Sequence, residues 1–151
     1  PVAGPPGSMF ETILVPTDGS DGAERAVDLA FDVATSHDSA LHTVSVVDAG
    51  RLPVDTDGDA WLVERALERD AERAIADVRE RADAAGVPVE SAMLYGRPAE
   101  AIREYVDDTD VDLVVLGTHG RRGLDHALLG SVTERVVRTA PVPVLTVRAS
   151  A

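Results

Sequence analysis

Short apolar runs and longer amphipathic segments alternate along the whole chain. The clearest apolar run lies within residues 111–116, and it is apolar on both faces, as a strand in the centre of a parallel sheet must be. The amphipathic segments place apolar residues every three or four positions, which predicts helices. Strands and helices that alternate with short connections call for an α/β fold, in which a parallel sheet carries helices on both faces.

The pattern predicts five strands and four helices. The strands are expected at residues 10–16, 40–47, 87–95, 111–116 and 142–147, and the helices at residues 21–34, 61–85, 98–106 and 131–139. Asp21 followed by Glu24 is typical of a capping box at the start of the first helix, and Gly86 ends the second. Residues 48–59, rich in Asp, Gly and Pro, are expected to form the most mobile loop.

The length is that of one ordinary domain. Residues 1–8 end in Gly-Ser ahead of Met9 and are interpreted as an added remnant, so that residues 9–151 form the single domain. No second domain, internal repeat or low-complexity segment is evident in the sequence.

Charge and composition exclude several classes of protein. There are 27 acidic and 14 basic residues, and the net charge of −13 argues against nucleic acid or an anionic membrane as a main partner. No apolar run approaches the roughly 18 residues that cross a membrane. The chain has no cysteine, which excludes thiol chemistry and fits a cytoplasmic protein. It also has no lysine, which excludes a Walker-type phosphate loop.

The excess of acid together with the absence of lysine resembles proteins of salt-loving archaea, where high salt screens the repulsion between like charges. An acidic protein from a GC-rich genome, which favours Arg over Lys, is the alternative.

Two loops are candidates for a binding site. In open parallel sheets, ligands bind beyond the carboxyl ends of the strands, where the strand order reverses. The loop after the first strand, residues 17–20, and the loop after the fourth, residues 117–130, both lie at this edge. If the first strand lies beside the fourth, the two loops line one crevice.

Glycine spacing in the second loop predicts a cradle for the phosphates of a nucleotide. Gly117 and Gly120 are followed, nine residues later, by Gly130 and Ser131 at the predicted start of a helix. Glycine lets backbone N–H groups approach a ligand, and a helix start favours an anion. The Ser131 side chain has two interpretations, a phosphate contact or a cap of its own helix with Glu134.

Other polar residues near these loops leave alternatives open. Asp18 could accept hydrogen bonds from ribose or adenine, or it could only shape the turn. His119 could pack or hydrogen-bond near the nucleotide, whereas a zinc site with His126 lacks a third ligand at comparable spacing. Arg121 and Arg122 could contact phosphates or remain solvated.

Four segments together resemble the ATP-binding class of the universal stress protein family. They read ILVPTDGS in the first strand and loop, HTVSVVD in the second strand, YGRPAEAI before the third helix, and LVVLGTHGRRGLDHALLGSVTERVVRTAPVPVLTVR at the end. The resemblance spans residues 9–148, and the last block is the most specific. The chain differs from many relatives at Gly123, and this glycine should loosen the loop after the fourth strand.

The resemblance implies a Rossmann-like adenine-nucleotide-binding fold with strand order 3-2-1-4-5. It implies that Asp18 and the Val46 backbone recognise adenosine in a pocket lined by Pro16, Thr17 and Leu116. Ribose and phosphates would be held by Gly117, Gly120, Gly130, Ser131 and Val132, with Mg or Mn bound through the phosphates. It also implies a homodimer formed by the strand between Val142 and Val147.

Three functions are compatible with these features. The first is an ATP-binding regulatory or stress-response protein without fast turnover, because no well-placed general base is evident. The second is a slow ATP hydrolase or another adenylate-using enzyme of the same fold. It is less favoured, because nucleotidyl transferases of the wider group carry an HxGH-type signature where this chain has Thr17-Asp18-Gly19-Ser20. The third is a partner-binding scaffold whose site prefers AMP or another adenylate.

Overall fold

The computed structural model describes residues 7–54, 58–119 and 129–148. Its elements, in chain order, are β1 (Thr12–Pro16), α1 (Asp21–His37), β2 (Ala40–Asp48), the 3-10 turn η1 (Ala49–Arg51), α2 (Asp59–Ala85), β3 (Val89–Gly96), α3 (Pro98–Asp108), β4 (Leu113–Gly117), α4 (Ser131–Thr139) and β5 (Val144–Val147). The five strands form one sheet in the order β3-β2-β1-β4-β5, and every pairing is parallel. The predicted α/β fold and strand order are confirmed.

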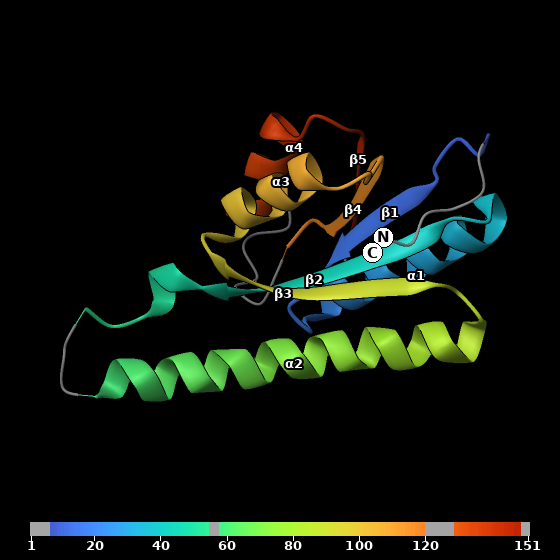
Figure 1. The fold of residues 1–151 in the computed structure, drawn as a ribbon. Coiled ribbons are helices and arrows are strands. Elements are labelled where there is room, and N and C mark those ends of the chain that lie inside the picture. The colour runs from blue at the N-terminus through green and yellow to red at the C-terminus, as the bar shows by residue number, and fades with distance from the viewer. Residues whose placement is uncertain (1–6, 55–57, 120–128, 149–151) are drawn as a thin grey trace.

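The sheet separates two helix layers, α1 and α2 on one face and α3 and α4 on the other (Figure 1). Alternation along each strand sends neighbouring side chains to opposite faces. In β1, Ile13 and Val15 pack with the α1 and α2 layer, whereas Leu14 packs with the α3 and α4 layer. All three side chains are fully buried, which explains why the central strands are apolar on both faces.

Several element boundaries differ from those predicted. α1 continues to His37 and is capped by Asp38, whose backbone N–H donates to the Ala34 carbonyl; the left-handed φ of 56° at Asp38 lets Ser39 N donate to the same carbonyl at 2.8 Å. The predicted loop over residues 48–59 contains η1, and its residues 55–57 lie outside the described part of the chain. β5 begins at Val144 rather than Val142, because Pro143 has no N–H for the ladder and contributes only its carbonyl to Val114 N, at 3.0 Å.

The predicted capping box at the start of α1 is wrong by one residue. Ser20 is the N-cap, and its Oγ accepts from Ala23 N at 3.2 Å. Asp21 is therefore the first residue of the helix, and Glu24 lies too far along to close the box. The Glu24 carboxylate instead forms an ion pair with Arg81 of α2 at 3.2 Å.

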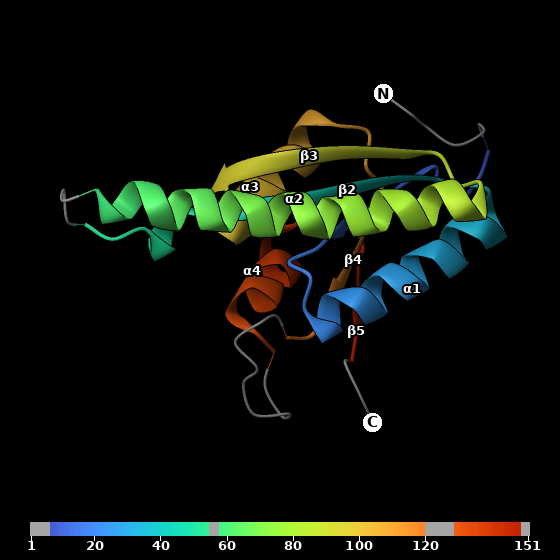
Figure 2. The same cartoon turned by 90° about the horizontal axis from the view of Figure 1, so that it is seen from below.

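α2 is longer than the strands it covers. Its buried face consists of Ala71, Ala74, Ile75, Val78 and Ala82, small enough residues to bring the helix close to the sheet. The turns before Ala71 project past the carboxyl ends of the strands (Figures 1 and 2), and there Trp61 is 62% exposed. The apolar face predicted for this helix is therefore buried only in its second half. No helix in the described residues is both long and apolar enough to cross a membrane.

Candidate functional site

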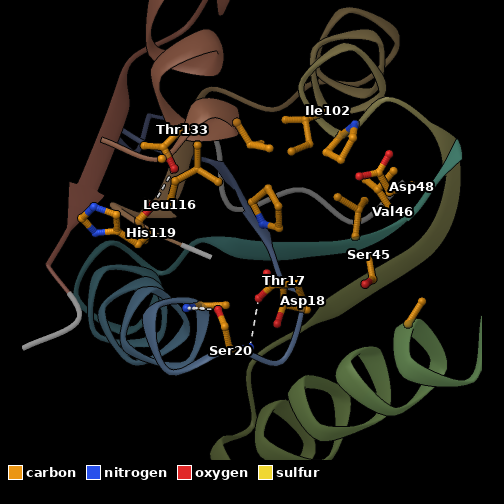
Figure 3. Close-up of a pocket in the computed structure, with 18 of the residues that line it drawn as sticks. Thr17, Asp18, Ser20, Ser45, Val46, Asp48, Ile102, Leu116, His119 and Thr133 are labelled. Carbon is orange, nitrogen blue, oxygen red and sulfur yellow. Dashed lines mark hydrogen bonds between the residues drawn. The ribbon is translucent and has the colours of Figure 1, made fainter. Parts of the chain in front are cut away.

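A cavity of about 440 Å³ opens where the carboxyl ends of β1, β2 and β4 meet the starts of α1, α3 and α4 (Figure 3). The projecting part of α2 closes one side of it through Leu67, Asp70 and Ala71. β1 lies between β2 and β4, so the loops after β1 and β4 both line the cavity, as the sequence predicted. This is the edge at which open parallel sheets hold their ligands.

Every predicted site residue within the described part of the chain lines this cavity. These residues are Pro16, Thr17, Asp18, Val46, Leu116, Gly117, His119, Gly130, Ser131 and Val132. Gly120 and Arg121 lie outside the described residues. The fold thus brings together residues that are more than a hundred positions apart in the sequence.

The loop after β1 is held by its own side chains. Thr17 N donates to the Val44 carbonyl at 2.8 Å, which continues the pairing of β1 with β2. Asp18 Oδ1 accepts from Ser20 N at 2.9 Å, and Thr17 Oγ1 accepts from Gly19 N at 3.2 Å. The turn-shaping role considered for Asp18 is therefore present, while its carboxylate also lines the cavity.

Gly117 packs against the first turn of α1. A Cβ atom at Gly117 would lie 2.6 Å from the Gly22 carbonyl oxygen, closer than real contacts allow. Its own carbonyl accepts from Thr133 Oγ1 of α4 at 2.7 Å (Figure 3). This glycine thus joins the starts of two helices, a packing role that accounts for its small size independently of any ligand.

α4 begins without a side-chain cap. Gly130 is its N-cap, with no side-chain cap bond, and the exposed Ser131 is its first residue. Of the two interpretations of the Ser131 side chain, the capping one is therefore wrong, and Glu134 is paired with Arg138 at 2.6 Å. Gly130 N donates to the Thr118 carbonyl at 2.7 Å, which closes the loop back onto the end of β4. The first turn of α4 borders the cavity through Ser131 and Val132.

His119 borders the cavity at the end of β4. Its Nδ1 lies 3.2 Å from Thr118 Oγ1, and its buried Nε2 has no hydrogen-bond partner among the described residues. The other residue of the zinc hypothesis, His126, lies outside the described part of the chain. Among the described residues no group of three or more His, Cys, Asp or Glu could hold a metal ion.

Sequence reasoning missed part of the lining. The missed residues are Ala23, Val44, Ser45, Asp48, Arg51, Leu67, Asp70, Ala71, Pro98, Ile102 and Thr133. Strand alternation could have identified Ser45, because a polar residue at a position facing the helices is unusual in a buried strand. Asp70 carried a similar signal, one turn before Ala74 on the packed side of α2. Pro98 and Ile102 are supplied by the start of α3, which the prediction had not placed at this edge.

A buried polar chain lies under α3, next to the cavity wall. His42 is 2% exposed, with its Nδ1 2.9 Å from the Tyr105 hydroxyl and its Nε2 3.1 Å from a Glu90 carboxylate oxygen. Burial raises the pKa of the Tyr105 phenol above its ordinary value of 10.0, and the Glu90 carboxylate raises it further. Tyr105 lies one turn after Ile102, which lines the cavity.

Comparison with known proteins places the chain in one family. The universal stress protein family matches residues 9–148. A universal stress protein of Thermus aquaticus is 43% identical over 141 residues, covering 93% of this chain and all of the relative. Universal stress protein MJ0531 of Methanocaldococcus jannaschii is 35% identical over 142 residues, covering 93% and 84%.

Solved structures show the same fold. The hypothetical protein MJ0577 superposes with a TM-score of 0.84 at 28% identity, covering 95% of this chain and 99% of that one. A universal stress protein in complex with cAMP superposes with a TM-score of 0.71 at 31% identity, covering 95% and 100%. The fold, the sequence match over residues 9–148 and the curated relatives agree, and the chain belongs to the universal stress protein family.

Proposed function

We propose that this protein binds an adenine nucleotide, most readily ATP, in the cavity at the carboxyl edge of the sheet. The base and ribose lie against Pro16, Thr17, Asp18 and the Val46 backbone, and the phosphates lie at the start of α4. One observation carries the proposal. The cavity joins the loop after β1 to a helix start whose cap lacks a side chain. Such a start offers backbone N–H groups and a favourable dipole to an anion.

The relatives support an adenine nucleotide as the ligand. The similar universal stress protein that was solved in complex with cAMP holds a molecule of this class. The proposed contacts also include Leu116, Gly117 and His119, which line the cavity. They include Gly120 and Arg121 as well, which lie outside the described residues.

A divalent ion, Mg or Mn, is proposed to accompany ATP through the phosphates. The cavity lining includes the carboxylates of Asp18, Asp48 and Asp70, but the described residues hold no cluster that could bind a metal alone. In nucleotide sites Mg²⁺ is usually held by substrate phosphates together with one or two carboxylates and waters. The ion would reduce the repulsion between the triphosphate and the acidic lining.

Binding without fast turnover is the proposed activity, which suits a stress-response or regulatory protein. The chain has no Cys or Lys, and Asp18 is engaged in the turn and proposed to face ribose or adenine. The alternative is a slow ATP hydrolase. His119 is the observation that favours it, since its buried Nε2 lacks a partner among the described residues.

We further propose a homodimer formed by the last strand, between Val142 and Val147. β5 lies at the edge of the sheet with only β4 beside it, and its Leu145 is 37% exposed. An edge strand with exposed apolar residues is suited to pairing with a second copy.

The acidic composition supports a proposal that the protein works at high salt. Salt screens repulsion between exposed carboxylates, so the unfolding temperature should rise steadily between 0.1 and 2 M KCl. A flat or falling profile would oppose this proposal.

Nucleotide content and turnover test the function. The protein is purified in high salt and denatured, and any released nucleotide is identified. The apo-protein is then titrated with ATP in the presence of Mg²⁺. Saturable binding of ATP is expected, and its absence refutes the proposal. Release of AMP alone would favour the scaffold function. Phosphate release faster than about once per minute, slow beside ordinary turnover numbers, would favour the hydrolase.

A further inference from the structure

One buried histidine takes no part in the proposed nucleotide contacts. His42 belongs to β2 and is 2% exposed. Residues of a strand alternate between faces, and Val44, two positions further on, packs with the α3 and α4 layer. His42 therefore lies on the face of the sheet that α3 covers. Histidine is the side chain whose charge ordinarily changes between about pH 5 and 8, so the partners of His42 decide what an added proton does there.

Glu90 of β3 and Tyr105 of α3 contact opposite sides of the His42 ring. Glu90 lies in register with His42, and one of its carboxylate oxygens is 3.1 Å from Nε2. The Tyr105 hydroxyl is 2.9 Å from Nδ1, and the two rings meet edge to face with their centres 5.9 Å apart. On β1 the residue in register with His42 is Leu14, which carries no charge, and every charged residue of α3 is exposed. This chain of contacts joins two strands to α3.

Hydrogen-bond chemistry determines where the protons lie when His42 is neutral. A carboxylate only accepts hydrogen bonds, and a neutral imidazole carries one N–H group. Nε2–H therefore donates to Glu90, and Nδ1 accepts from the Tyr105 hydroxyl. Burial raises the pKa of Tyr105, and the Glu90 carboxylate raises it further, so the phenol keeps the proton that it donates.

A proton added to Nδ1 reverses one of these hydrogen bonds. Both ring nitrogens of an imidazolium are donors, so Nδ1–H must donate to the Tyr105 oxygen, and the hydroxyl proton must turn away from the ring. The hydrogen bond to Glu90 keeps its direction and becomes an ion pair. Protonation of His42 therefore changes the contact between β2 and α3, whereas it preserves the contact between β2 and β3.

α3 connects this contact to the cavity. Tyr105 lies one turn after Ile102, which lines the cavity together with Pro98 at the start of the same helix (Figure 3). On β2, Val44 lies two residues after His42 and also lines the cavity. The hydrogen bond between His42 and Tyr105 thus joins the two elements that form this wall.

We infer that His42 is a proton-sensitive switch, in which protonation reverses the hydrogen bond with Tyr105, loosens α3 and weakens nucleotide binding. The effect on nucleotide rests on the proposed function, whereas the effect on α3 does not. Neutral His42 pairs a donor with an acceptor at both of these contacts, so this form holds α3 against the sheet. A nucleotide that contacts the wall in this position binds the neutral form more tightly, and binding and protonation oppose each other.

Nuclear magnetic resonance of the ligand-free protein tests the switch itself. The ring nitrogens of His42 should show the Nε2–H tautomer at about pH 8, and the methyl signals of Ile102 should change with the same midpoint as the His42 ring between about pH 8 and 5. An Nδ1–H tautomer, a ring that stays neutral throughout, or Ile102 signals that stay constant while His42 takes up its proton would each show the inference to be wrong.

Calorimetric titration with ATP and Mg²⁺ tests the effect on the site. ATP itself gains a proton in this range, so affinities of two proteins are compared at the same pH. Tyr105→Phe removes the hydrogen bond that protonation reverses. The affinity of the wild type relative to this variant should fall about fivefold between about pH 8 and 5, the lower end of ordinary coupling between sites. Tyr95→Phe is the control, because Tyr95 also bonds to a glutamate but lies outside the cavity lining, and its relative affinity should stay constant.

Glu90→Gln provides a second variant, at a side chain that is 44% exposed. It removes the carboxylate that stabilises the imidazolium, so the His42 midpoint and the pH dependence of ATP affinity should move to lower pH together. If the wild type binds no ATP at any pH, the proposed function fails, and the Ile102 signals still decide whether the switch exists. If ATP binds and the ratio of wild type to Tyr105→Phe stays constant with pH, or Glu90→Gln moves the His42 midpoint alone, the inference is wrong.

Discussion

Three helices begin at the cavity, and the first turns of two of them, α1 and α4, are built differently. α1 is capped by the Ser20 hydroxyl and carries Asp21 and Glu24 in its first turn. α4 starts at Gly130 with no side-chain cap, and its first acidic residue, Glu134, is paired with Arg138. Under the proposed function, we therefore expect an anion to be disfavoured at the capped start of α1 and accepted at the uncapped start of α4. This difference indicates that a helix start can bind phosphate only where no capping side chain already accepts hydrogen bonds from the backbone N–H groups of its first turn.

The largest effect is expected from making α4 resemble α1. Gly130 has φ −59° and ψ 152°, a conformation open to any residue, so Gly130→Asp should fold and cap the helix. The new carboxylate would stand where the phosphates are proposed to bind. Affinity for ATP should fall on the order of 100-fold, since like charges in contact cost several kcal/mol. Adenosine, which lacks phosphate, serves as the control and should bind as it does to the wild type.

Gly117 connects the two helix starts, so changing it should disturb both. Gly117→Ala would place a Cβ atom 2.6 Å from the Gly22 carbonyl oxygen, and backbone atoms on both sides would have to move. We expect a loss of about 1–3 kcal/mol in the free energy of unfolding, as for other overpacked sites. Urea unfolding measures it. Stability equal to the wild type would show that Gly117 is not held tightly between the helices.

Removing the cap of α1 should separate stability from binding. Ser20→Ala deletes the acceptor for Ala23 N, which costs about 1 kcal/mol and lowers the unfolding temperature by about 2–4 °C in a chain of this size. Ser20 also lines the cavity, but it lies at the start of α1 and not of α4, so ATP affinity should fall far less than it does for Gly130→Asp. A large loss of ATP affinity without loss of stability would contradict the assignment of the phosphates to α4 and would indicate that they bind at the start of α1.

The smallest effect concerns α3, the third helix that begins at the cavity. It has no side-chain cap, and Tyr105 anchors it to His42. Because the pKa of Tyr105 is raised in the folded protein, its contribution to stability is complete below pH 10 and is lost as the pH rises through the raised value. Tyr105→Phe should flatten the decline in unfolding temperature above pH 10. An unchanged slope would contradict this linkage.

The fold could be predicted because its signals are periodic. The apolar residues of β1, β4 and α1 each repeat with the period of their own kind of element, strand or helix. These periods together fit one topology, a parallel sheet covered by helices. The helix starts could not be predicted to the residue. Ser20 and Asp21 are both good cap residues, and it is the hydrogen bond of Ser20 Oγ with Ala23 N that identifies Ser20 as the cap, while Glu24 pairs with Arg81 of another helix. The capping alternative for Ser131 could not be excluded from the sequence, because glycine can serve as an N-cap without a side chain.

The candidate site could be predicted only where it follows a motif. Gly130 belongs to the spaced glycines after the fourth strand, and Asp18 follows the first strand directly, so both could be identified from neighbouring residues. Periodicity marks Ser45 and Asp70 only as polar residues on packed faces. They line the cavity because β2 and α2 pack side by side and α2 projects beyond the sheet, an arrangement that no spacing in the sequence encodes. Residues supplied by tertiary packing therefore need the structure, even in a chain whose family is evident.

Backbone amide signals followed during titration with ATP and Mg²⁺ test the central claim most directly. If phosphates bind at the uncapped helix, the amides of Gly130, Ser131 and Val132 should shift most and those of Asp21 and Gly22 much less. Larger shifts at the start of α1, with α4 unchanged, would contradict the account.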